Sequence, residues 1–200
     1  MATDERIDEI LEFWFGAAPE GEERPAGREM WFTRSARVDR IIQKRFGRLV
    51  ERALAGQLDA WAETPRGRLA LILLLDQFPR NLNRELPEAY EGDEKALSLC
   101  FDGLDEGMDR HLRPVERCFF YMPAMHAEDT DAQLASVEVF QELVDEVGPE
   151  DKPLCEEFLK HAERHRDIVE RFERFPHRNA ILGRTSTPEE SAFLQQSGEL

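Results

Sequence analysis

The sequence predicts an all-α protein of seven to eight helices, formed by residues 1–200 as a single domain. Apolar residues recur at the helical spacing of about 3.6 residues in nearly every segment. Capping residues, glycines and prolines divide these segments at intervals that suit helices. We find no convincing segment with the apolar/polar alternation of a strand. A chain of 200 residues can bury an adequate core as one domain, which completes the prediction.

Two helices are expected before residue 57. Thr3 is suited to cap the first, which has an apolar face up to Trp14 and a stop at Gly16. Residues 17–28 are polar and contain two prolines and two glycines, so they predict a loop. The second helix ends at Gly56, and one of its faces is apolar: Val38, Ile41, Ile42, Phe46, Leu49, Val50 and Ala53.

The most apolar stretch, residues 69–75, follows Thr64 and Pro65, which are suited to cap and begin a helix. A strand is possible there, but leucine and alanine favour a helix. A helix that is apolar on all sides belongs in the middle of a bundle. Pro79 disfavours the helical conformation at the residue before it, so this helix is expected to end near Phe78.

Five further helices are expected in the second half of the chain, each bounded by a glycine, a proline or a capping residue. They cover residues 88–106, Pro114 to Pro123, the stretch after the turn at 126–130 up to Gly148, Leu154 to the region of Pro176, and a terminal helix with a capping box at Thr187 and Glu190.

The charge balance excludes several classes of partner. The chain has 42 acidic and 26 basic residues, hence a net charge of −16. Such a field repels nucleic acid and anionic membrane surfaces, so neither is expected as a partner. No apolar run is long enough to span a membrane, and the acidic residues within 1–10 do not fit a signal peptide. A soluble, cytoplasmic protein is therefore expected.

Cysteine and histidine give little support for a metal or cofactor. Three widely spaced cysteines fit neither a disulfide framework nor a zinc cluster. His161 and His165 share a helix face and could both ligate a metal, but Arg164 between them disfavours a cation. We therefore predict no metal and no cofactor.

A similar turn occurs twice in the chain. Residues 78–81 read Phe-Pro-Arg-Asn, and residues 175–179 read Phe-Pro-His-Arg-Asn. One explanation is a reused helix end, in which phenylalanine packs in the core and arginine pairs with an acid. The other is that both arginines face one interior space and share an anion, which is Asp76, Glu128 or a ligand.

The candidate site combines these two turns with nearby polar residues. Guanidinium groups bind carboxylates and phosphates, and asparagine both donates and accepts hydrogen bonds. Because imidazole exchanges protons near neutral pH, His126 is the candidate acid–base residue, with Glu128 beside it. The predicted ligand-binding residues are Asp76, Arg80, Asn81, His161, His177, Arg178 and Asn179.

Several motifs in order resemble the domain of unknown function 924 family. They are Leu-Leu-Asp-Gln-Phe-Pro-Arg-Asn (74–81), Tyr-Met-Pro-Ala-Met-His-Ala-Glu (121–128), Arg-Phe-Pro-His-Arg-Asn (174–179) and Leu-Gly-Arg-Thr-Ser-Thr-Pro-Glu-Glu (182–190). The resemblance covers essentially the whole chain. It implies antiparallel helices in a tetratricopeptide-like superhelical or bundle arrangement, and it implies no activity or cofactor.

Three functions follow from these patterns. The leading prediction is a small anionic molecule or peptide bound at an interior or concave site lined by arginine, asparagine and histidine, with or without catalysis. The alternative is a scaffold that binds another protein on a concave helical surface. A metal-dependent hydrolase is third. The sequence specifies neither the ligand nor the oligomeric state.

Overall fold

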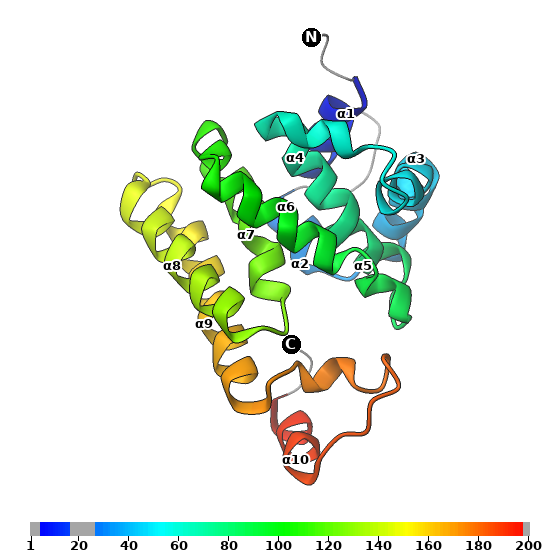
Figure 1. Ribbon diagram of the computed structural model, residues 1–200, viewed down its shortest axis with the longest axis vertical. Coiled ribbons are helices and arrows are strands. Elements are labelled where there is room, and N and C mark those ends of the chain that lie inside the picture. Colours follow the sequence, from blue (N-terminus) through cyan, green and yellow to red (C-terminus); the bar gives the residue numbers. More distant parts are fainter. Residues whose placement is uncertain (1–4, 17–26, 198–200) are drawn as a thin grey trace.

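The computed structural model describes residues 5–16 and 27–197. Helices and their connecting turns make up this part of the chain, with no β-strand in it, which confirms the all-α class (Figure 1). The α-helices are α1 (Glu5–Phe15), α2 (Arg28–Phe32), α3 (Ala36–Leu54), α4 (Pro65–Ile72), α5 (Phe78–Leu82), α6 (Asp93–Asp105), α7 (Pro114–His126), α8 (Thr130–Glu146), α9 (Lys152–Phe172) and α10 (Pro188–Ser197). The shorter turns are η1 (Asp59–Glu63), η2 (Leu73–Gln77), η3 (Pro87–Tyr90), η4 (Met108–His111) and η5 (Pro176–Arg178).

Side-chain caps fix the helix starts that the sequence predicts. The Thr64 hydroxyl accepts a hydrogen bond from the backbone N–H of Gly67 at 3.2 Å and so caps α4. At α10 the Thr187 hydroxyl accepts from the N–H of Glu190, while the Glu190 carboxylate accepts from the N–H of Thr187. The predicted capping box is therefore confirmed. The predicted cap at Thr3 lies outside the described residues.

The short helix α2 is not predicted by the sequence. The predicted loop covers residues 17–28, of which 17–26 lie outside the described residues, and α2 begins at Arg28. Gly27 before it has a φ of 59°, in the left-handed region that glycine tolerates. The indole N–H of Trp31 donates to the carbonyl of Trp14 at 2.9 Å, which ties α2 to α1. Tertiary contacts rather than local propensity thus stabilise this helix.

Two expected helix ends are wrong, and a proline is involved in each. Phe78 keeps a helical conformation, and the chain continues through Pro79 to Leu82. The turn η2 before it is a π turn, so Pro79 falls in the first turn of α5, where a missing N–H is tolerated. Pro123 likewise lies inside α7, which ends at His126 and not at Pro123. The helix expected from residue 88 begins at Asp93, after the 3₁₀ turn η3.

The main core is organised around α4 and η2. All seven residues from Leu69 to Leu75 are fully buried, as expected for a helix that is apolar on every side. Phe78 continues this core, with ring centroids 5.4 Å from Trp14 and 5.3 Å from Phe46. These aromatic contacts connect α1, α3 and α5, and they form the base on which the pocket described below is built.

The chain after α9 returns towards α7. Figure 1 shows α8 and α9 side by side, followed by the orange and red C-terminal segment. Glu173 ends α9 with a φ of 57°, and the Glu128 carboxylate then accepts a hydrogen bond from the N–H of Phe175 at 2.8 Å. A second, smaller core cluster of Ile168, Val169 and Phe175 packs there. None of the described helices combines the length and the apolar composition needed to cross a membrane.

Candidate functional site

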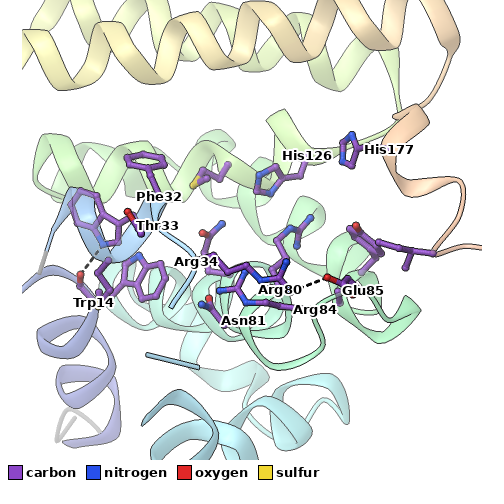
Figure 2. Close-up of a pocket in the computed structure, with 17 residues that line it drawn as sticks. Trp14, Phe32, Thr33, Arg34, Arg80, Asn81, Arg84, Glu85, His126 and His177 are labelled. Atoms are coloured by element: carbon purple, nitrogen blue, oxygen red, sulfur yellow. Dashed lines mark hydrogen bonds and ion pairs between the residues drawn. The ribbon is translucent and has the colours of Figure 1, made fainter. Parts of the chain in front are cut away.

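A pocket of about 530 Å³ lies where five parts of the chain meet. Its walls come from α1, from α2 and the residues after it, from the η2–α5–η3 region, from α7 and from the C-terminal segment (Figure 2). The lining residues are Trp14, Met30, Trp31, Phe32, Thr33, Arg34, Gln77, Arg80, Asn81, Arg84, Glu85, Ala89, Tyr90, Met122, His126, His177 and Ile181.

The lining is divided by chemistry. In Figure 2, Phe32 and Trp14 lie at one end of the pocket, Arg80 and Arg84 lie along its lower side, and His126 lies opposite the arginines. The predicted residues Arg80, Asn81, His126 and His177 therefore line the pocket together, although they come from sequence positions almost one hundred residues apart.

The fully buried carboxylate of Asp76 holds His126 in place. Its Oδ1 lies 2.7 Å from Nδ1 of His126 and 3.0 Å from Nη1 of Arg80, and the amide of Gln77 donates to its other oxygen. Burial alone raises the pKa of Asp76, but the charges of Arg80 and His126 outweigh it and hold that pKa below its usual range. Asp76 is therefore a carboxylate that accepts from Nδ1–H of His126, and in the neutral imidazole Nε2 is the basic nitrogen.

The two similar turns converge, and the anion between them is Asp93. Arg80 donates to both oxygens of Asp93, at 2.8 and 2.9 Å, and Nη1 of Arg178 lies 3.6 Å from Asp93 Oδ2. Both guanidinium groups also lie over the ring of Tyr90, at 5.5 and 4.8 Å from its centroid. A Cβ on Gly92 would collide with the carbonyl of Leu75, so glycine lets α6 approach closely enough to place Asp93 there.

Arg178 is buried and does not line the pocket. Its exposed fraction is 6 %, and it donates to the carbonyl of His126 at 2.9 Å. Of the second turn, His177 reaches the pocket instead. Burial, together with the charge of Arg178, lowers the pKa of His177 to about 4, so this imidazole is neutral near pH 7.

Two predicted residues, Glu128 and Asn179, stabilise the C-terminal segment outside the pocket. The Glu128 carboxylate pairs with Arg184 at 2.5 Å. Burial raises the pKa of Glu128, but the hydrogen bond from Arg184 outweighs this and lowers it. Asn179 accepts from Arg184 at 3.0 Å and donates to Ser186 at 3.0 Å. Both residues therefore stabilise the C-terminal segment. Neither lines the pocket that His126 lines.

His161 lies behind the aromatic end of the pocket and does not line it. Its ring stacks on Phe32 with centroids 6.1 Å apart, and its carbonyl lies 2.7 Å from Nδ1 of His165. That contact occupies one of the two nitrogens with which His165 could ligate a metal. Among the described residues no group of three or more His, Cys, Asp or Glu side chains is arranged to hold a metal ion. The cysteines at 100, 118 and 155 are buried and unbridged.

Part of the basic side of the pocket is not predicted from the sequence. Arg84 donates to both oxygens of Asp39 at 2.8 Å, and Asn81 donates to the same carboxylate at 2.9 Å. Arg34 pairs with Glu85 at 2.8 Å. Arg84 lies beyond the end of α5 at Leu82, so helical spacing from Arg80 does not predict that the two arginines share the pocket.

This geometry defines an all-α protein with a pocket that is basic on one side and aromatic at one end. The chain belongs to the family described as bacterial protein of unknown function DUF924, whose model matches residues 10–198. It is also similar to a protein of unknown function, ATU0120 from Agrobacterium tumefaciens, whose structure has been solved. The two are 38% identical with a TM-score of 0.82, over 96% of this chain and 98% of that one. The search of curated proteins gives no match.

Proposed function

We propose that the pocket binds a small molecule that carries an anionic group, and that His126 exchanges a proton with it. The observation that carries this proposal is the convergence of Arg80, Asn81, Arg84 and His126 on one pocket. Its volume of about 530 Å³ falls within the usual range for small-molecule sites.

The arginines of the lining support an anionic ligand. The lining contains Arg34, Arg80 and Arg84, and each is paired with a carboxylate, so the support comes from their oriented N–H donors and not from an excess of positive charge. Asp39 and Asp93 hold two of these guanidinium groups by paired hydrogen bonds, which fixes their planes before a ligand arrives. Donors that are already oriented cost less entropy on binding.

The contact between Asp76 and His126 supports a proton exchange. A buried carboxylate that orients a histidine selects one tautomer and stabilises the protonated ring when it forms. With Nδ1 donating to Asp76, Nε2 of His126 is the nitrogen that accepts a proton from a ligand or returns it. Asp76 is a positioning residue here, because it is fully buried and acts through His126.

One observation favours the alternative, a protein-binding scaffold. Arg80 and Arg178 both pair with Asp93, so neither turn needs a ligand to balance its charge. Phe32 and Leu86 are about half exposed, as residues at a protein-binding surface would be. A scaffold would bind its partner on the surface and would hold no ligand inside the pocket. Experiments on ligand binding inside the pocket therefore separate the two proposals.

The indole signals of tryptophan in a ¹H–¹⁵N spectrum test the proposed function. The chain has three tryptophans, of which Trp14 and Trp31 line the pocket and Trp61 does not. We expect millimolar acetate or inorganic phosphate, at constant ionic strength, to move the signals of Trp14 and Trp31 and to leave Trp61 in place. The shifts should weaken in Arg84→Gln.

The matched control is Arg66→Gln, because Arg66 is also paired with an aspartate, Asp8, but lies outside the pocket. This variant should respond to the anions as the wild type does. The proposed function is wrong if neither anion moves the two pocket signals, or if the control and Arg84→Gln respond alike.

A further inference from the structure

The apolar end of the pocket is a rigid surface. The Trp31 ring lies 4.9 Å from Phe119 and 6.1 Å from Phe15, both measured between centroids. Its indole N–H is already used by the carbonyl of Trp14, so the rest of the ring offers only apolar surface. Aromatic packing from the core therefore fixes this wall.

Part of this wall is open to solvent. Phe32 is 45% exposed, although it stacks on His161 and lies 5.6 Å from Phe158. Met30 and Met122 add further apolar lining, and methionine adapts to flat ligands of differing shape. An exposed aromatic side chain that the core holds in place suits contact with an apolar ligand.

The basic side belongs to the same cavity. Arg80 and Asn81 lie on α5 and Arg84 follows its C-terminal end, and Figure 2 shows all three along the lower side beside the aromatic end. Arg84 uses Nε and Nη2 for Asp39, and Nη1 makes no hydrogen bond within the described part of the chain. Guanidinium donors thus remain available next to the apolar wall.

A compact anion satisfies only half of these features. Acetate or phosphate fills a small part of about 530 Å³ and leaves the tryptophan and phenylalanine surfaces wet. A neutral apolar molecule would instead remove water from the arginine side without providing an acceptor, which costs free energy. Only a molecule with both an apolar body and an anionic group can cover the apolar wall and also accept hydrogen bonds from the arginines.

On the basis of the proposed function, we propose that the ligand is an amphiphilic acid: a flat apolar or aromatic body joined to a carboxylate or phosphate. The body lies against Trp31 and Phe32, and the anionic oxygens lie at Arg80, Asn81 and Arg84. Carboxylate and phosphate share oxygens that accept hydrogen bonds from the two N–H groups of a guanidinium. The experiment below distinguishes a carboxylate ligand from a phosphate ligand.

Calorimetric titration of the full chain with four probes tests this inference. The probes are 1-naphthoate, 1-naphthyl phosphate, 1-naphthalenemethanol and acetate. The better naphthyl acid should bind about 100-fold more tightly than acetate, because the ring buries apolar area. It should bind about 10-fold more tightly than the alcohol, because only the acid accepts charge-assisted hydrogen bonds. Which naphthyl acid binds more tightly identifies the head group, and either result supports the inference.

Two sets of variants assign the parts of the ligand to the parts of the pocket. Phe32→Ser should weaken the naphthyl acids and leave acetate unchanged, and Trp31→Leu is a second variant of the same wall. Arg84→Gln should weaken both acids and leave the alcohol unchanged, whereas the control Arg66→Gln should change nothing. Circular dichroism of each variant verifies that it is folded.

The failure of the inference and that of the proposed function give different results. If acetate binds as tightly as 1-naphthoate and still depends on Arg84, the pocket takes compact anions, so the inference is wrong while the proposed function stands. If the alcohol binds as tightly as the acids and Arg84→Gln has no effect, the pocket does not select anions and both are wrong.

Discussion

The two similar turns, residues 78–81 and 175–179, share a sequence motif, but they place different side chains in the pocket. Both phenylalanines, Phe78 and Phe175, are fully buried. In the first turn Arg80 lines the pocket, whereas in the second the additional His177 lines it and Arg178 is buried behind. The second turn has one additional residue, and a different side chain reaches the cavity. A shared motif can therefore predict which chain segments meet. The neighbouring charged groups determine which side chain remains available to a ligand.

Removal of Asp93 should break the link between the turns and have the largest effect on stability. Asp93→Ala leaves Arg80 and the buried Arg178 close together without their shared anion. Loss of one partner from a largely buried ion pair costs about 3–5 kcal/mol. Urea unfolding should show this loss, and Asp93→Asn, which keeps an acceptor, should lose less. A loss of under about 1 kcal/mol for Asp93→Ala would contradict the shared role of Asp93.

Acid should weaken the second turn through His177 within it and through His165 of α9, which packs on Phe175. Burial, with the charge of His126, lowers the pKa of His165 to about 3, and the pKa of His177 is about 4. The unfolded chain protonates histidine near pH 6.5, so it binds more protons than the folded chain below that pH. The stability that these two histidines contribute is thus complete above about pH 6.5 and falls towards pH 4, by up to about 1.4 kcal/mol per histidine for each pH unit.

Urea unfolding at a series of pH values measures this slope. The double variant His165→Gln, His177→Gln should lose most of it between pH 6.5 and pH 4. An unchanged slope in that variant would mean that other groups cause the acid sensitivity.

Loss of the pair between Glu128 and Arg184 should loosen only the C-terminal segment. Glu128→Gln keeps an acceptor for the N–H of Phe175 but removes the charge opposite Arg184. We expect a loss of about 1 kcal/mol, since the pair is partly exposed. Hydrogen exchange should accelerate in residues 173–187 and stay unchanged in α4. Equal acceleration in both regions would show that the segment does not open separately.

The smallest effect is expected for an ion pair that is exposed to solvent. Arg171 and Glu189 are both more than half exposed, so Arg171→Ala should change the free energy of unfolding by at most about 0.5 kcal/mol. Urea unfolding measures this reference value. A larger loss would contradict the small contribution expected of exposed ion pairs.

The sequence predicts most of the fold because helices depend on local patterns. Periodicity, the cap at Thr64 and the capping box at Thr187 are readable without tertiary structure. Pro79 and Pro123 mislead because a π turn and packed neighbours support helix where local preference opposes it. Tertiary packing, which the local pattern does not encode, decides in both cases.

The candidate site is predictable only in part. Arg80, Asn81, His126 and His177 can be found from the repeated turns and from the chemistry of histidine. The roles of Asp93, Tyr90 and Arg34 cannot, because they depend on how α6, η3 and the residues after α2 pack against α5. The exposure of Phe32 also cannot be inferred from the sequence, because it depends on how the residues around it pack.

Metabolite binding by the full chain tests the central claim most directly. Wild type and Arg84→Gln are dialysed to equilibrium against a bacterial metabolite extract, and the molecules retained by each are identified by mass spectrometry. We expect the wild type to enrich carboxylates or phosphates with an apolar body, and we expect Arg84→Gln not to do so. No enriched acid, or equal enrichment by both proteins, would contradict that claim.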